Sequence, residues 1–364
     1  MSSAVGDITF RPRKILAIKL RSMGDTVLMT APLAQLREAF PDAQIHVAVT
    51  AQWATLLQNH PAINRLWPVE RHRDKLSRAK AIARTALKLR RENFDCAFNF
   101  HASPSSATLA FASGARVRSI HFHGHKAKNQ YSTVTVPGKG TLKPVIERDM
   151  DTLRALNLTI PEGLLPQLHL RPGEMNNAFN KLQKMSLPRP ILAVGLGSSR
   201  PTKCWPVDRY AQLSADWHSK TGGGVVVITG PGEEALHISF FEALGGRGKA
   251  APIHAPEVRE LAAVLSQCSA FVGNDSGPKH AAVAVQTPTV TLFGPEHPFE
   301  WHPYSREQHP YFFVEALKCR QDGMAGMPPW CALEVCEKEE HRCMRLTEPG
   351  PVLEECLRVM RKMD

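Results

Sequence analysis

The residues best suited to chemistry stand at positions 274–280, which read Asn-Asp-Ser-Gly-Pro-Lys-His directly after an apolar run. Small polar residues allow a tight turn and begin helices well, and a proline suits the first helical turn. Free backbone N–H groups at such a helix start bind anions, and the lysine and histidine add side-chain donors. The sequence therefore predicts a phosphate or diphosphate site at Asp275, Ser276, Gly277, Lys279 and His280.

An Asp-Ser-Gly run often does no more than cap a helix, and the charged residues after it then lie in solvent. Here the run follows an expected strand of a parallel sheet. Open α/β sheets bind their ligands beyond the carboxyl ends of the strands. This location favours a ligand site over a simple helix cap.

A second loop with anion-binding residues follows the apolar run at 191–196. It contains Ser198, Ser199 and Lys203, whose hydroxyl and ammonium groups can surround a phosphate together with backbone N–H groups. Its spacing is neither that of a Walker loop nor that of a dinucleotide-binding fingerprint.

A third turn, at 230–234, reads Gly-Pro-Gly-Glu-Glu and begins a helical pattern. A carboxylate at this place either interacts favourably with the helix dipole or binds the ribose hydroxyls of a nucleotide. Glu233 and Glu234 are both candidates, and the pattern does not choose between them.

The first half of the chain contributes a carboxylate at an equivalent turn. Residues 15–20 form an apolar run typical of a buried parallel strand, and Gly24 and Asp25 follow it before a helical pattern. On the residues alone, Asp25 is an N-cap of that helix, which needs no chemistry. After a later expected strand, His101 and Ser103 either contact an acceptor or cap the next helix.

Short apolar runs alternate with helical patterns along the chain, which predicts an α/β protein with parallel sheets. We expect strands at residues 15–20, 45–49, 63–69, 94–100, 117–122, 167–170, 191–196, 224–229 and 270–273, and helices at residues 51–59, 147–158, 257–268 and 352–363. Because 364 residues exceed one ordinary core, two domains are expected, with a proline-rich boundary near 171–188. The polar stretch 126–143 is expected to be a mobile loop over the acceptor site.

The net charge of +11 predicts an anionic partner, such as nucleic acid, a phosphorylated glycan or an acidic membrane face. Residues 71–91 hold nine lysines and arginines against Asp74, with apolar residues at helical spacing. This basic helix is either a solvated outer face or a contact for lipid headgroups or a phosphorylated acceptor. No apolar run approaches the ~20 residues of a membrane span, and no signal peptide is recognised, so a cytoplasmic protein is expected.

Eight cysteines are too dilute for a disulfide scaffold in a chain of this length. Four of them, Cys319, Cys331, Cys336 and Cys343, lack the paired spacing of a zinc knuckle, so free thiols, a metal and a disulfide all remain open. Three histidines at 121, 123 and 125 do not predict a metal site, because no acidic or cysteine partner lies nearby. No cofactor or metal is expected.

Taken together, four of these motifs resemble those of glycosyltransferase family 9, the bacterial lipopolysaccharide heptosyltransferases. The motifs are the Gly24-Asp25 turn, the serine loop that continues to Lys203-Cys-Trp-Pro, the Gly-Pro-Gly-Glu turn and the stretch from Asp275 to His280. The resemblance implies the GT-B architecture, in which two Rossmann-like domains face each other across a cleft. It assigns residues 1–172 to the acceptor domain, 188–345 to the nucleotide-sugar domain, and 346–364 to a helix that packs back on the first domain.

The resemblance also implies an inverting single displacement, with Asp25 as general base and with Ser198, Ser199 and Lys203 on the diphosphate. Gly24, His101 and Ser103 would contact the acceptor, and Glu233 or Glu234 the nucleoside. The implied donor is ADP-heptose and the implied acceptor is the inner core and lipid A region of lipopolysaccharide, reached from the cytoplasmic face of the inner membrane. Glu296 replaces the threonine usual in the family's Gly-Pro-Thr turn, which leaves the sugar preference open.

Other functions remain open alternatives. The chain could use another nucleotide sugar or acceptor. A nicotinamide oxidoreductase is disfavoured because Gly-x-Gly-x-x-Gly follows no expected strand. A non-catalytic basic protein that binds nucleotides or nucleic acid fits the charge, but aromatic residues for base stacking are sparse in the basic helix, so nucleic acid is not expected as a partner.

Overall fold

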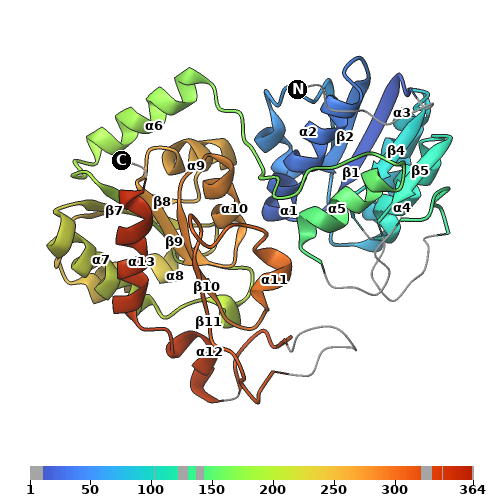
Figure 1. Ribbon diagram of the computed structural model, residues 1–364. Coiled ribbons are helices and arrows are strands. Elements are labelled where there is room, and N and C mark those ends of the chain that lie inside the picture. Colours follow the sequence, from blue (N-terminus) through green and yellow to red (C-terminus); the bar gives the residue numbers. More distant parts are fainter. Residues whose placement is uncertain are drawn as a thin grey trace. The chain divides into compact units, whose positions relative to one another are not determined.

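The computed structural model describes residues 11–101, 103–121, 130–136, 143–320, 330–337 and 339–362 (Figure 1). The chain divides into two compact units, Met1–His169 and Leu170–Asp364. Each unit has its own parallel sheet and its own hydrophobic core. The domain limits expected from the sequence, 1–172, 188–345 and 346–364, stay a prediction.

The first unit is built on a sheet with the strand order β3-β2-β1-β4-β5. The central strand β1 pairs in parallel with β2 and β4, and its side chains from Ile15 to Ile18 are fully buried. Helices cover both faces of such a strand, which is why its sequence is apolar throughout rather than alternating. The strands are β1 (Lys14–Lys19), β2 (Gln44–Thr50), β3 (Arg65–Val69), β4 (Cys96–Asn99) and β5 (Val117–Ile120).

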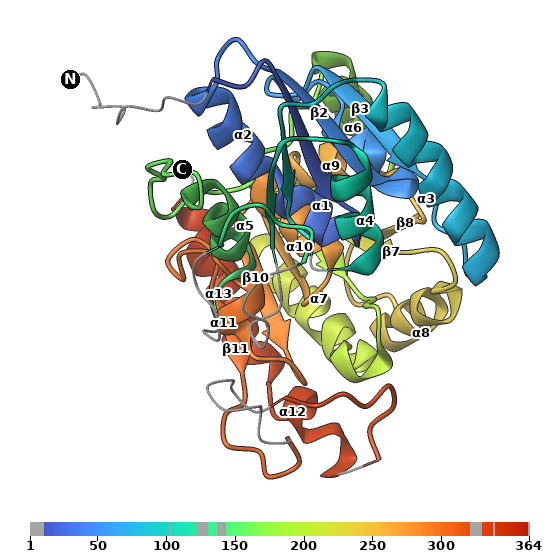
Figure 2. The same cartoon turned by 90° about the vertical axis from the view of Figure 1, so that its right-hand side faces the viewer.

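Helices α3 and α4 lie together on one side of this sheet, and α5 lies on the other side (Figure 2). α5 also contacts α2, so the two faces of the sheet are covered by separate pairs. The helices of this unit are α1 (Met23–Leu28), α2 (Thr30–Ala39), the 3-10 helix η1 (Ala51–Leu57), α3 (Lys75–Arg90), α4 (Pro104–Ala112) and α5 (Val145–Arg154).

The second unit contains a six-stranded parallel sheet with the order β8-β7-β6-β9-β10-β11. This is the order of the doubly wound dinucleotide-binding fold, whose ligands bind beyond the carboxyl ends of the strands where the order reverses. In this unit the reversal lies between β6 and β9, and in the first unit it lies between β1 and β4. The strands are β6 (Ile191–Gly195), β7 (Gly224–Thr229), β8 (Ala250–His254), β9 (Ala270–Asn274), β10 (Thr289–Phe293) and β11 (Tyr311–Phe313).

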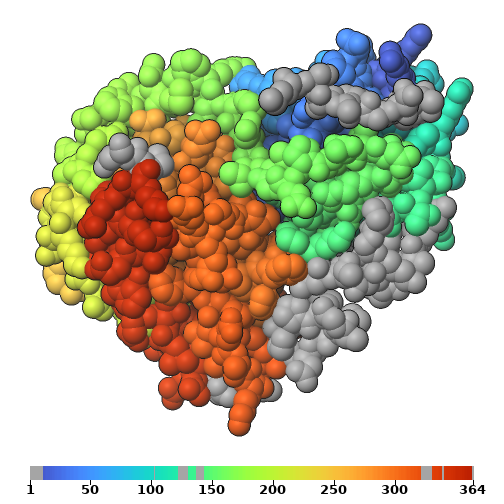
Figure 3. Space-filling view, viewed as in Figure 1, coloured from blue at the N-terminus to red at the C-terminus, as the bar shows by residue number. Residues whose placement is uncertain are grey.

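The core of the second unit includes Trp205, Tyr210 and Trp217, all buried, together with residues of the last helix. That helix, α13, packs on α7, β9 and β10 and is visible in red on the surface of this unit (Figure 3). Its expected packing on the first domain stays a prediction. The helices of the unit are α6 (Pro172–Lys184), η2 (Pro201–Lys203), α7 (Val207–Thr221), α8 (Glu234–Leu244), α9 (Val258–Leu265), α10 (Gly277–Ala284), α11 (Pro298–Trp301), η3 (Glu339–His341), α12 (Arg342–Arg345) and α13 (Pro349–Arg361).

Two expectations about local structure were wrong. Residues 167–170 form no strand, because the backbone N–H of Gln167 is bound to the Thr30 hydroxyl rather than to a neighbouring strand. The expected linker at 171–188 holds the helix α6, since Pro172 occupies its first turn and Glu174 accepts from the backbone N–H of Arg171 at 2.7 Å. Most of the expected mobile loop at 126–143, with His123 and His125 before it, lies outside the described residues.

Within the described part of the chain, no helix is both long and apolar enough to cross a membrane.

Candidate active site

Asn274, at the end of β9, links β9 to the segments that follow β6, at the point where the strand order of the second sheet reverses. Its side-chain amide donates to the carbonyl of Leu196, and its oxygen accepts from the backbone N–H of Trp205 and from the Tyr210 hydroxyl, at 2.8 to 2.9 Å. The Ser198 hydroxyl donates to the Asp275 carbonyl at 3.2 Å. The two predicted anion-binding loops are therefore neighbours at the carboxyl edge of β6 and β9, while Ser199 is exposed beside them.

Asp275 lies between two lysines. Its carboxylate accepts from Lys279 at 2.6 Å and from Lys203 at 2.7 Å, one ammonium group on each oxygen. Burial alone would raise the pKa of the Asp275 carboxyl, but the two ammonium groups outweigh it and hold that pKa well below its usual range. Asp275 is therefore a permanent anion in this site.

The two lysines differ in access to solvent. The side chain of Lys279 is 0% exposed and also donates to the carbonyl of Trp301 at 3.0 Å, whereas Lys203 is 11% exposed. The ammonium group of Lys279 is therefore enclosed and donates to two acceptors inside the protein, which disfavours a direct contact with a ligand; its expected ligand role stays a prediction. Sequence alone could not reveal this, since the Trp301 carbonyl comes from a separate element.

Glu296 extends this cluster of charges. It pairs with Arg200 at 2.5 Å and lies 3.7 Å from the ammonium group of Lys203. The cluster thus contains three cations and two carboxylates, which leaves one net positive charge beside the start of α10. The cations are Lys203, Lys279 and Arg200, and the carboxylates are Asp275 and Glu296. An electrostatic surplus of this kind attracts an anion to the residues that remain accessible, Lys203 foremost.

His280 follows on α10 and is buried. Its Nδ1 lies 2.5 Å from the hydroxyl of Tyr304, which is also buried. Burial, with help from the Lys279 ammonium group, holds the pKa of His280 well below its usual value. The imidazole is therefore neutral near pH 7.

Glu233 and Glu234 point to different places. The Glu233 carboxylate accepts from the backbone N–H of Gly230 at 2.6 Å and lies so close to Gly197 that a Cβ there would stand 1.9 Å from its Oε1. Glycine at 197 is thus required for this approach. Glu233 therefore belongs to the same edge of the sheet as Ser198.

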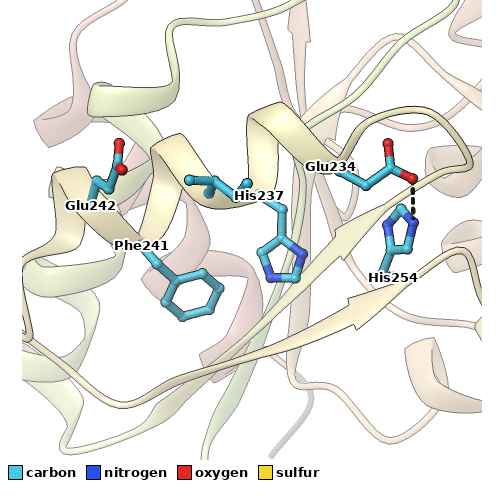
Figure 4. A pocket seen from close by; sticks show the side chains of 6 residues that line it. Glu234, His237, Phe241, Glu242 and His254 are labelled. Atoms are coloured by element: carbon cyan, nitrogen blue, oxygen red, sulfur yellow. Dashed lines mark hydrogen bonds and ion pairs between the residues drawn. The ribbon is translucent and has the colours of Figure 1, made fainter.

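Glu234 instead belongs to a pocket of about 520 Å³ on the side of α8 (Figure 4). Its Oε1 lies 3.0 Å from Nε2 of His254, which comes from β8. The pocket is lined by Glu234, His237, Ile238, Phe241, Glu242 and His254. Its aromatic and imidazole rings can receive a flat, partly apolar group such as a nucleobase.

In the first unit, Asp25 lies beyond β1 in the first turn of α1. The helix is capped by Ser22 rather than by Asp25, and the Ser22 hydroxyl donates to Asp25 Oδ2 at 2.6 Å. Arg21 approaches the same oxygen at 3.5 Å. The other oxygen, Oδ1, is buried and accepts no hydrogen bond from the residues that the structure describes, with the Lys19 ammonium group 4.0 Å away. Asp25 is only 4% exposed, and within the described part of the chain its Oδ1 keeps a lone pair that is not hydrogen-bonded.

Lys19 is held by a second carboxylate, Asp149 of α5, with which it forms a hydrogen-bonded ion pair. Burial raises the pKa of Asp149 to about 6, although Lys19 opposes the rise. Sequence reasoning missed Asp149. The signal was a carboxylate on the buried face of a helix, next to Met150 and one turn before Leu153.

His101 and Ser103 lie beyond β4, the neighbour of β1. Ser103 caps α4 by accepting from the backbone N–H of Ser106 at 3.2 Å, and its hydroxyl lies 3.2 Å from His101 Nδ1. Both residues thus shape the start of α4. Contact with an acceptor remains a prediction for them and for Gly24, which is buried in α1.

The cysteines at 319, 331, 336 and 343 line one small cavity together with His341, and all eight cysteines carry free thiols. The segment that bears them is bound to η2: the Thr202 hydroxyl donates to Leu333, the Thr202 carbonyl bonds to His341, and Arg200 donates to the Cys331 carbonyl. Among the residues that the structure describes, no group of three or more His, Cys, Asp or Glu is arranged to hold a metal ion. The segment therefore braces the loop that presents Lys203.

The sequence model of glycosyltransferase family 9 (heptosyltransferase) matches residues 82–322. The chain belongs to this family. Lipopolysaccharide heptosyltransferase 3 of Escherichia coli K12 is 27% identical over 304 residues, which are 79% of this chain and 84% of that protein. Lipopolysaccharide heptosyltransferase 2 of the same strain is 26% identical over 296 residues, 78% of this chain and 84% of that protein.

Solved structures of family 9 members share the fold. A family 9 glycosyltransferase from Veillonella parvula DSM 2008 superposes with a TM-score of 0.77 at 19% identity, covering 96% of this chain and 98% of that one. The E. coli ADP-heptose lipopolysaccharide heptosyltransferase II gives 0.72 at 21% identity, covering 96% and 99%. The expected family and the expected GT-B fold, with two Rossmann-like units, are both confirmed.

Proposed function

We propose that this family 9 glycosyltransferase moves a heptose from ADP-heptose to the inner core of lipopolysaccharide with inversion at the anomeric carbon. The observation that carries the proposal is the charge cluster around Asp275, with its net positive charge at the sheet reversal of the second unit. A leaving diphosphate needs such a site. The sugar and the acceptor are proposed from the E. coli relatives, which are lipopolysaccharide heptosyltransferases.

On the leaving-group side of the single displacement, negative charge collects on the diphosphate as the bond to the sugar breaks. Lys203 and the N–H groups at the start of α10 are fixed donors for that charge, and fixed donors lower the barrier without reorganising. Ser198, Ser199, Ser276, Gly277 and His280 complete the set. Lys279 acts indirectly, because it holds Asp275 in place.

On the acceptor side of the same step, the acceptor hydroxyl must lose its proton as it attacks. Asp25 can take that proton on Oδ1, for which the described part of the chain offers no hydrogen-bond donor, while Ser22 fixes Oδ2. Lys19 stabilises the carboxylate from 4.0 Å. The mechanism requires the Asp25 site and the diphosphate site to act on the same donor and acceptor molecules at the same time.

For the nucleoside, Glu233 is the better candidate for the ribose hydroxyls, because it lies at the same sheet edge as Ser198. The base would then occupy the pocket beside Glu234 and His254 (Figure 4).

The basic helix α3 supports an acceptor that lies in an anionic membrane. Only Leu89 of this helix is buried, and Leu76 and Leu87 are 66% and 67% exposed. Among the described residues, Lys80, Arg84 and Lys88 form no ion pair. Cations with exposed leucines bind the surface of anionic bilayers. We therefore place the protein on the cytoplasmic face of the inner membrane.

The deciding experiment incubates the protein with ADP-heptose and a panel of truncated lipopolysaccharides and weighs the products. One heptose should be added to the acceptor that ends at the correct core sugar, and ADP should be released. If a sugar were added only from a different nucleotide sugar, the donor would not be ADP-heptose. Binding of ADP without any transfer across the panel would favour a non-catalytic nucleotide-binding protein.

The membrane assignment has its own test. The wild-type protein should sediment with phosphatidylglycerol vesicles and stay in solution with phosphatidylcholine vesicles. The triple variant Lys80→Glu, Arg84→Glu, Lys88→Glu should lose this binding but still bind ADP. Equal sedimentation of wild type and variant would remove α3 from the membrane contact.

A further inference from the structure

We propose that Tyr304 positions His280 for the leaving diphosphate: its hydroxyl donates to Nδ1, so that the imidazole keeps its proton on Nε2 and offers it to the anion. The inference rests on the proposed function, because it requires a diphosphate at the start of α10. Tyr304 would then act through His280 and not by touching the substrate.

The contact joins two separate parts of the second unit. His280 belongs to α10, and Tyr304 lies 24 residues later, between α11 and β11. The Nδ1 to hydroxyl distance is 2.5 Å, and both side chains are buried. In such surroundings the hydrogen bond is not exchanged for one with water, so it decides how the ring is protonated.

A neutral imidazole has one nitrogen that donates and one that accepts. His280 is neutral near pH 7, because burial first and Lys279 second lower its pKa. Burial raises the pKa of Tyr304 well above its usual value, so the phenol keeps its proton. Two arrangements are then possible: the phenol donates to Nδ1, or Nδ1 donates to the phenol.

With a diphosphate bound beside Nε2, only the first arrangement uses every donor. If Nδ1 carried the proton, the Tyr304 hydroxyl hydrogen would have no acceptor among the described residues, and a bare Nε2 lone pair would face the anion. If the phenol donates, its hydrogen and the Nδ1 lone pair are both used, and Nε2–H is left to donate to the anion. Nε2 forms no hydrogen bond within the described part of the chain, which leaves it for a ligand.

The ring of Tyr304 is fixed independently of its hydroxyl. It packs edge-on against His302, with ring centroids 5.2 Å apart, and at a tilt against His309 at 5.5 Å. His302 is itself anchored by Nε2, which lies 2.6 Å from the carbonyl of His309. Removing the hydroxyl alone, by Tyr304→Phe, should therefore leave the packing intact.

The test combines calorimetry with ADP and nitrogen NMR of protein labelled with ¹⁵N-histidine. The His280 ring signals are those that disappear in His280→Gln. In the wild type they should show a bare Nδ1 and a protonated Nε2. In Tyr304→Phe they should shift towards a mixture of tautomers, and the Kd for ADP should rise about three- to tenfold, as expected for one hydrogen bond.

The His280→Gln background separates positioning from packing. A glutamine amide offers its N–H without any tautomer, so Tyr304→Phe should change the Kd no further in that background. A mere packing role would instead lower the Tm of Tyr304→Phe and leave the tautomer and Kd unchanged, which would overturn the inference. So would a wild-type spectrum with the proton on Nδ1.

The result also distinguishes this inference from the proposed function. If the wild type fails to bind ADP, the proposed diphosphate site is wrong whatever the tautomer. If ADP binds equally well to the wild type and to Tyr304→Phe, and Nε2 stays protonated in Tyr304→Phe, the diphosphate site is supported and the positioning role of Tyr304 is wrong.

Discussion

Replacing Lys203 and Lys279 by methionine should separate ligand binding from folding, although both ammonium groups bind the same carboxylate. Lys203 keeps 11% of its side chain exposed, whereas Lys279 is 0% exposed and has a second internal partner in the Trp301 carbonyl. Only Lys203 can turn towards an anion. A charge-assisted hydrogen bond contributes about 1.5–3 kcal/mol, so Lys203→Met should raise the Kd for ADP about 10- to 100-fold.

Lys279→Met should instead destabilise the fold. Removing one partner of a buried ion pair costs about 3–5 kcal/mol, and because Lys203 still neutralises Asp275, we expect the lower end of that range. For a domain of this size, that loss lowers the Tm by roughly 6–12 °C. Lys203→Met should lower it by less, because the enclosed ammonium group of Lys279 remains on Asp275.

The assays are isothermal calorimetry with ADP and thermal unfolding followed by circular dichroism. Lys220→Met is the matched control, because Lys220 is 50% exposed and pairs with Glu354, which is exposed as well; neither the Kd for ADP nor the Tm should change. The reasoning fails if Lys203→Met binds ADP like the wild type, or if Lys279→Met unfolds at the wild-type temperature and loses nucleotide affinity instead.

Three further predictions follow from the two half-sites and from α6. Asp25→Asn should abolish transfer of the sugar and leave the Kd for ADP within about twofold, because Asp25 belongs to the acceptor half; full turnover would exclude Asp25 as the base. Glu233→Gln should weaken ADP binding by about tenfold and Glu234→Gln by much less, and calorimetry showing the reverse order would move the ribose contact to Glu234. Arg259 lowers the pKa of Glu174 to about 2, so the stability from this pair is present above about pH 4.5 and is lost as the pH falls towards 2. Glu174→Gln should therefore cost about 1 kcal/mol in urea unfolding at pH 7 and less at pH 3, and an equal cost at both values would contradict the ion pair.

Much of the site could be predicted from local sequence because it lies on strand-turn-helix units. Turn-forming residues at 230–232 and 274–277 mark two of those turns, and parallel strands bring successive turns to one edge. What the sequence could not supply are contacts between distant residues. The pairing of Lys19 with Asp149 spans 130 residues, and the use of Lys279 as an internal cation depends on a carbonyl 22 residues away.

The errors in the fold have a similar cause. At α6, Pro-Gly indicated a linker, because the same proline that breaks a helix interior is favoured in a first turn, and only the capping contact of Glu174 distinguishes the two. At 167–170, the sequence pattern predicted a strand, but the structure has none. A strand needs a neighbouring strand to bind its backbone N–H and C=O groups, and here the Gln167 N–H binds the Thr30 hydroxyl instead.

The bracing of η2 by the cysteine segment has a practical consequence for anyone handling this enzyme. The residue before Lys203 is held by Leu333 and His341, in the segment that carries Cys331, Cys336 and Cys343. If Lys203 binds the nucleotide as proposed, alkylating reagents or maleimide dyes on those thiols should disturb these hydrogen bonds and lower the nucleotide affinity without touching the nucleotide. Inhibition by such compounds should therefore never be taken as proof of a cysteine nucleophile.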